Sequence, residues 1–107
     1  MGDKASAVKR LKNKKLKEWS LAVRERANFK CEWCGRTKEE IKLNSHHIIT
    51  KKFEALKFSL DNGLCLCPKC HRFGILCAHN NPIRVFVWLK ENRLESLKNL
   101  IEALKEK

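Results

Sequence analysis

The sequence predicts a small α+β fold, in which two short strands lie between flanking N- and C-terminal helices. Three observations predict it: apolar residues recur at helical spacing near both ends, the middle alternates apolar and polar residues, and two Cys-x-x-Cys pairs frame that middle. A chain of 107 residues has room for one domain. We expect a basic arm or helix start over residues 1–15 and a single domain over residues 16–107.

A long basic helix is predicted at the start of the chain. Half of the net charge of +12 lies in residues 1–17, where seven Lys or Arg residues stand against Asp3 alone. Such a segment is either a solvated tail or an arm lying along nucleic-acid phosphates, and both interpretations stay open. Apolar residues on one face predict a helix that ends near Asn28: Val8, Leu11, Leu16, Trp19, Val23 and Ala27.

The middle of the chain predicts a two-stranded hairpin. Ile41 to His46 alternates apolar and polar residues, as a strand does. Residues 50–59 are basic and irregular. Asp61-Asn62-Gly63 is a strong turn signal, and a second short strand is expected from Gly63 to Leu66.

Three helices are predicted after the second strand, the last two over residues 82–106. Pro68 suits the first turn of a helix that carries Cys70 and His71. The next helix begins after Asn81 and breaks or bends at Asn92, with a buried side expected at Ile83, Phe86, Val87 and Trp88. The leucine-rich residues 94–104 predict an amphipathic helix, which we expect to pack against the N-terminal helix rather than form a dimer interface.

The two Cys-x-x-Cys pairs supply four thiolates, which suits a tetrahedral, structural Zn²⁺: Cys31, Cys34, Cys67 and Cys70. Disulfides are the alternative, but the polar N-terminus lacks a signal-peptide segment, so we expect a cytoplasmic protein whose cysteines bind metal. A thioredoxin-like redox site is less well supported, because no βαβ pattern accompanies the pairs. Cys65 and Cys77 stand outside the pairs and are expected in the core.

A second site is predicted from the histidines. Thirty-two residues separate Cys34 from Cys67, more than the roughly 15–20 of compact zinc ribbons, so the gap must hold structure of its own. All four histidines lie in residues 46–79, and the zinc does not need them. Adjacent side chains of a strand point to opposite faces, so His46 and His47 cannot share one role. A neutral imidazole can take a proton from water near neutral pH.

These motifs, taken in order, closely resemble the HNH endonuclease family over about residues 29–82. The resemblance rests on Cys-x-x-Cys, Ser45-His46-His47-Ile48-Ile49, Asp61-Asn62 and Leu66-Cys67-Pro68-Lys69-Cys70-His71. It implies a ββα-metal, treble-clef-like core around one catalytic divalent ion, with a separate Cys₄ zinc joining the hairpin to the helix. Thr50 replaces the proline frequent after His-His-Ile-Ile, which alters loop rigidity but touches no catalytic atom.

The resemblance also implies a role for each histidine. His47 looks like the general base, and Asn62 matches the residue that braces the loop presenting it. His46 and His71 stand where the family places ligands of the catalytic metal, and His79 is a further ligand candidate. The ion itself stays open among Mg²⁺, Mn²⁺, Ni²⁺ and Zn²⁺.

We therefore expect a hydrolase that nicks or cuts double-stranded DNA, with Lys51, Lys52 and Arg72 on the DNA backbone. No apolar run reaches the roughly 18 residues that span a bilayer, so no membrane partner is expected. We expect a monomer or weak dimer in a prokaryotic or phage setting, with packaging or restriction proteins as candidate partners. The alternatives are a zinc-stabilised nucleic-acid-binding module without catalysis and a protein-interaction domain of such a system.

Overall fold

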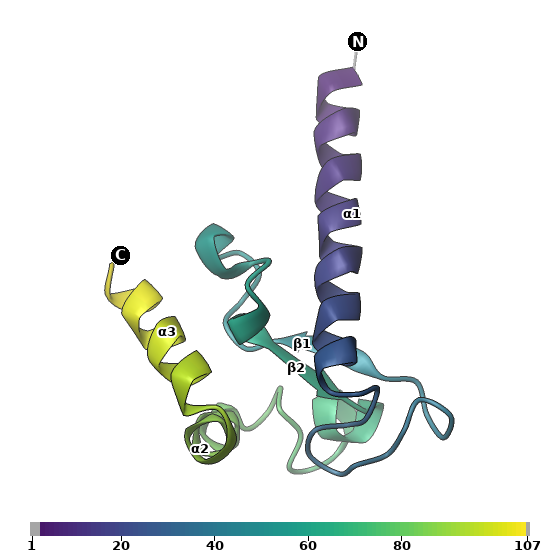
Figure 1. The fold of residues 1–107 in the computed structure, drawn as a ribbon, viewed down its shortest axis with the longest axis vertical. Helices are drawn as coiled ribbons and strands as arrows, with labels where there is room; N and C mark the ends of the chain where they lie inside the picture. The colour runs from purple at the N-terminus through teal and green to yellow at the C-terminus, as the bar shows by residue number, and fades with distance from the viewer. Residues whose placement is uncertain (1–2, 107) are drawn as a thin grey trace.

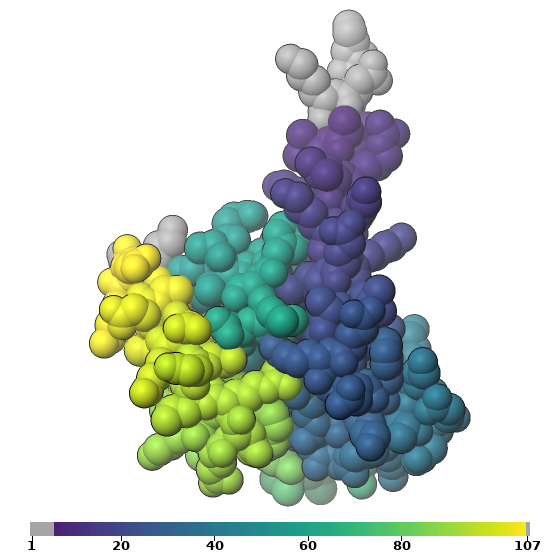
Figure 2. All heavy atoms as spheres, in the orientation of Figure 1, coloured from purple at the N-terminus to yellow at the C-terminus, as the bar shows by residue number. Residues whose placement is uncertain are grey.

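The computed structural model describes residues 3–106, with side chains from residue 6 onwards. Helix α1 (Asp3–Arg26) stands upright, and its N-terminal half extends beyond the rest of the molecule (Figures 1 and 2). Strands β1 (Asn44–His47) and β2 (Gly63–Leu66) pair antiparallel, from Asn44 opposite Leu66 to His47 opposite Gly63. The predicted α+β fold, a two-stranded sheet with flanking helices, is confirmed.

The remaining elements are short turns followed by two helices. The long connection between the strands contains the 3₁₀ turns η1 (Glu54–Leu56) and η2 (Leu60–Asn62). A single π-helical turn, η3 (Lys69–Phe73), follows β2. Helices α2 (Pro82–Asn92) and α3 (Leu94–Lys105) end the chain on the side of the hairpin away from α1 (Figure 1). None of the helices in residues 3–106 is long and apolar enough to cross a membrane.

The sheet lies directly against the C-terminal part of α1. Trp19 and Val23 are buried there, and Leu64 and Leu66 of β2 have no exposed surface. Gly63 permits this approach, because a Cβ at that position would stand 2.3 Å from a methyl carbon of Val23. The contact fixes the hairpin against the helix, which matters because β1 carries both His46 and His47.

The turn before β2 is held from two sides. The Arg26 guanidinium of α1 donates to the carbonyl oxygens of residues 60 and 63, both at 2.6 Å. The Asp61 carboxylate accepts from Ser96 Oγ at 2.8 Å and from Asn99 Nδ2 at 3.0 Å, both on α3. Helices at opposite ends of the chain therefore fix the turn that contains Asn62.

The first cysteine pair is also tied to the hairpin. Glu32 lies between the two cysteines and pairs with Arg93 at the junction of α2 and α3. Its Oε2 accepts from the Cys65 backbone N–H at 2.8 Å, and its own N–H donates to the Cys65 carbonyl at 2.8 Å. A largely buried carboxylate is satisfied in this way by a cation and a backbone donor.

Three predicted elements differ from the structure in burial or in extent. Val8 and Leu11 are exposed, because α1 leaves the body before it reaches them. The first strand begins at Asn44 rather than Ile41. The predicted helix carrying Cys70 is only η3, which closes with a bond of 2.8 Å from the Gly74 N–H to the Lys69 carbonyl.

The buried side predicted for the 82–92 helix is wrong. Val85 and Leu89 are buried, Trp88 is half-buried, and the other expected positions are exposed: Ile83, Phe86 and Val87. This helix is apolar on most of its circumference, so its periodicity did not select a face. The expected packing of the last helix on α1 is also wrong. Helix α3 buries Leu97 and Leu100 and packs against α2, η1 and η2 instead.

Candidate active site

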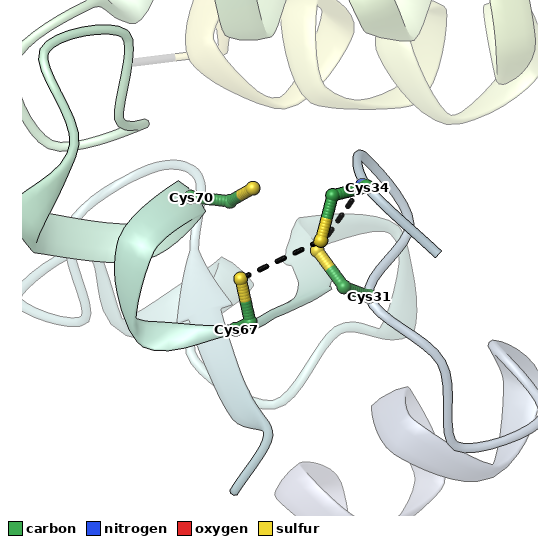
Figure 3. Close-up of side chains that lie close together, drawn as sticks. All are labelled: Cys31, Cys34, Cys67 and Cys70. Atoms are coloured by element: carbon green, nitrogen blue, oxygen red, sulfur yellow. Dashed lines mark hydrogen bonds between the residues drawn. The ribbon is translucent and has the colours of Figure 1, made fainter. Parts of the chain in front are cut away.

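Four cysteine sulfurs converge between the turn that follows α1 and the end of β2 (Figure 3). All lie within 4.8 Å of one another, and the Sγ atoms of Cys34 and Cys67 are 3.6 Å apart. Tetrahedral zinc with Zn–S bonds of about 2.3 Å separates its sulfurs by about 3.8 Å. The cluster of Cys31, Cys34, Cys67 and Cys70, named here the cysteine cluster, can therefore hold a zinc ion.

Within the cysteine cluster, the surroundings lower the thiol pKa of Cys31 but raise the thiol pKa of Cys34 and Cys70. Burial opposes ionisation of Cys31, but backbone N–H groups of Cys67, Cys34 and Trp33 outweigh it and lower the pKa of the thiol to about 7. Burial raises the pKa of Cys70, so a bound cation is needed to favour its thiolate. Cys65 is fully buried outside the cluster, and burial raises its pKa to about 11. Cys77 is also fully buried, so both are core residues as expected.

Three histidines meet at a second cluster, named here the histidine cluster: His46 on β1, His71 on η3 and His79 in the loop before α2. Their ligand atoms all lie within 4.8 Å of one another, and the Nε2 atoms of His71 and His79 are 2.9 Å apart. The backbone brings the last two together, because the His79 N–H donates to the His71 carbonyl at 3.2 Å. Residues far apart in the sequence thus form one nitrogen-rich site.

The donor set of the histidine cluster fits a divalent transition metal. Burial, and then the charges of neighbouring histidines, lower the pKa of His46 to about 3. Burial also lowers the pKa of His71 to about 4. Neutral imidazole is the form that ligates metal, and a nitrogen-only set suits Mn²⁺, Ni²⁺ or Zn²⁺ better than Mg²⁺. The buried Nδ1 of His71 has no hydrogen-bond partner among the described residues.

His47 turns away from the histidine cluster, as the alternation of a strand predicts. Its ring stacks on the Trp19 indole, with centroids 3.9 Å apart and planes 12° apart. Its Nε2 lies 2.9 Å from the Lys57 carbonyl oxygen, which can only accept, so Nε2 carries the proton. Nδ1 is then the basic nitrogen. Burial lowers the pKa of His47, although the Lys57 carbonyl opposes this shift.

Asn62 is fully buried and bonds to both ends of the loop that follows His47. Its Oδ1 accepts from the Ile49 N–H at 2.7 Å, and its Nδ2 donates to the Ile49 carbonyl at 2.9 Å and to the Leu56 carbonyl at 3.1 Å. Ile49 lies two residues after His47. Leu56 directly precedes Lys57, and the carbonyl of Lys57 orients the His47 ring. Asn62 therefore fixes the backbone on both sides of that imidazole.

Trp19 is a residue at this site that sequence reasoning missed, since the sequence places it only on the apolar face of the first helix. Besides stacking on His47, its Nε1–H donates to the Ser59 carbonyl at 2.8 Å. No local pattern reveals the role, because α1 and the hairpin meet only in the folded chain. The sequence gives only one hint of this contact, which is a tryptophan on the apolar face of the N-terminal helix.

An open cavity of about 640 Å³ is lined by residues from both faces of β1. His46, His47 and the other two histidines line one part, and apolar residues of α2 and α3 line the rest. Of the three residues expected on the DNA backbone, Lys51 and Arg72 line this cavity, whereas Lys52 is an exposed neighbour. Space for a ligand therefore exists beside both His47 and the histidine cluster.

Comparison with known proteins identifies this region. Residues 31–73 match the family model described as HNH endonuclease. This part of the chain is therefore similar to HNH endonucleases. The match includes the whole cysteine cluster, His46, His47, Asn62 and His71, and leaves Trp19 and His79 outside. No curated protein and no solved structure matches the chain. The HNH assignment indicates nuclease-type function and a nucleic-acid partner.

Proposed function

We propose that this protein is a metal-dependent HNH endonuclease that hydrolyses phosphodiester bonds of double-stranded DNA. One observation carries the proposal: a half-buried His47, stacked on Trp19 and bonded through Nε2 to the Lys57 carbonyl, lies beside three converging histidines in one open cavity. Resemblance to the family adds 5′-phosphate and 3′-hydroxyl ends as the expected products.

His47 acts as the general base in this proposal. Its Nδ1 takes a proton from the attacking water, while Nε2–H keeps its bond to the Lys57 carbonyl and stabilises the imidazolium that forms. General-base assistance of this kind contributes about 10²–10⁴-fold to the rate. Trp19 and Asn62 act as positioning residues, because they hold the ring and its loop without touching the substrate.

His46, His71 and His79 are proposed to hold the catalytic ion in their neutral forms. A divalent ion bound there would polarise the phosphoryl oxygen and support the leaving oxygen. The three side chains leave room for substrate, because they face the cavity and His79 is exposed. The cysteine cluster is proposed to hold a structural zinc that joins the first cysteine pair to β2 and η3.

Cations around the cavity are proposed to bind the DNA backbone. Lys51 and Arg72 lie at the cavity itself, with Lys52 next to them. Residues 6–17 of α1 add six Lys or Arg residues and no acid. Among the described residues, none of these six forms an ion pair, so their charge is available to phosphates.

The test is nicking of supercoiled plasmid by zinc-loaded protein, without added metal and with Mg²⁺, Mn²⁺, Ni²⁺ or Zn²⁺. We expect nicking with at least one metal and a loss of about 10²–10⁴-fold in His47→Ala. Unchanged nicking by His47→Ala would contradict the mechanism. Salt-sensitive DNA binding without nicking by any metal would favour a binding module without catalysis.

A further inference from the structure

An apolar loop emerges between two residues of the histidine cluster. Phe73 is 81% exposed, Ile75 is 92% exposed and Leu76 is 59% exposed. The loop begins after His71 and returns at His79, whose Nε2 atoms are 2.9 Å apart. Three large apolar side chains are therefore exposed on a loop that starts and ends at the histidine cluster.

The backbone of this loop is fixed, although its side chains are free of the core. Asn81 Nδ2 donates to the Ile75 carbonyl at 2.9 Å, and the Arg84 guanidinium donates to the Leu76 carbonyl. The Cys77 N–H donates to the Gly74 carbonyl at 3.1 Å. Part of the ordering cost of binding is thus already met, as in a preorganised recognition element.

The positive charges around residues 73–76 indicate an anionic binding partner. Residues 62–90 contain no Asp or Glu, while Lys69, Arg72 and Arg84 lie within or beside the loop. A cationic border around apolar side chains matches a polyanion that has an apolar interior. A nucleic-acid duplex has this construction, with phosphates outside and stacked bases inside, and apolar side chains are known to enter base steps.

We propose that Phe73, Ile75 and Leu76 form a wedge that enters a groove of the duplex beside the scissile phosphate and partly unstacks the adjacent base step. The inference rests on the proposed function, since a phosphate at the histidine cluster brings the neighbouring bases to the loop. Unstacking costs free energy, so a duplex that is already distorted binds more tightly.

The test separates binding from cutting by using the full zinc-loaded chain with His47→Ala. Short duplexes carry 2-aminopurine, whose fluorescence rises on unstacking, with or without a central mismatch. We expect a fluorescence rise on binding and about tenfold tighter binding of the mismatched duplex. Adding Phe73→Ala and Ile75→Ala should abolish both effects. Adding Val87→Ala and Leu94→Ala, which removes exposed apolar side chains that do not line the cavity, should leave both unchanged.

Three outcomes would overturn the wedge. One is an equal fluorescence rise and mismatch preference with and without Phe73 and Ile75. Another is a dimer in sedimentation that these two substitutions dissociate, which would make the loop a subunit interface. A third is no binding to either duplex. Failure of the parent chain to nick plasmid would instead count against the proposed function, because the fluorescence signal requires no cleavage.

Discussion

The cysteine cluster and the histidine cluster lie next to each other but differ in how completely the protein surrounds them. Cys70 and His71 are consecutive residues of η3, yet each belongs to a different cluster. Four sulfurs are enough to fill the tetrahedral coordination of a zinc ion, and Cys31 and Cys67 are buried while Cys34 is exposed. Three nitrogens do not fill such a coordination, and they border an open cavity. Closed sites are typical of structural metals and open sites of catalytic ones.

This difference suggests how the short turn η3 can contribute Cys70 to a site for stability and His71 to a separate site for chemistry. The sulfur ligands come from both sides of the hairpin, so a metal there would join segments 33 residues apart. The nitrogen ligands border space for a substrate, so a metal there would be reached from solvent. We expect substitutions in the two clusters to affect different measurements.

The largest expected effect is on folding, from Cys34→Ser. Structural zinc contributes about 10–16 kcal/mol in small zinc domains, so losing one ligand should remove the metal and the cooperative melt. Circular dichroism melting and zinc analysis of the purified protein check this. Cys77→Ser is the matched control, because Cys77 lies outside the cluster and a hydroxyl can still donate to the Arg72 carbonyl. A wild-type melt for Cys34→Ser would contradict the structural role.

A smaller effect is expected on catalysis from Trp19→Phe. Phenylalanine keeps an aromatic face against His47 but loses the hydrogen bond to the Ser59 carbonyl. A tilted base should lower kcat by about tenfold with little change in KM, since misplacement affects the reacting geometry. Steady-state nicking kinetics and their pH profile measure this, with Trp88→Phe as control. An unchanged kcat and pH profile would leave Trp19 as core packing only.

The smallest effect is expected from the arm, through neutralisation of Lys9, Lys12 and Lys15 to Gln. Each lost phosphate contact should reduce the slope of log affinity against log salt by about 0.9, with no change in melting. Fluorescence anisotropy on a DNA duplex gives the slope. Gln at Lys90 and Lys98, on α2 and α3, is the control for bulk charge. A slope that stays the same would mean that the arm is only solvated.

Sequence alone predicted the two clusters better than the packing around them. The Cys-x-x-Cys spacing predicted the four cysteines that lie together, and the resemblance to the HNH family supplied the three histidines that meet. His79 lies outside the segment matched to the family, yet it joins His46 and His71 in space. The roles of these residues in catalysis remain proposals.

The helices were harder to predict because their partners are distant in the chain. Helix α2 is apolar on most faces, so nothing local selected Val85 and Leu89 over Ile83 and Phe86. Helix α3 packs on α2 because the two follow each other directly through Arg93. The stacking of Trp19 on His47 requires α1 to dock on β1, which no periodicity encodes.

The most direct test of the division between the two clusters is plasmid nicking by His71→Ala, with zinc content and melting measured on the same preparation. The account predicts about one zinc per chain, a wild-type melting temperature and nicking reduced by at least about 100-fold, because an open metal site loses a ligand while the closed one stays intact. Wild-type nicking by folded, zinc-loaded His71→Ala would contradict it.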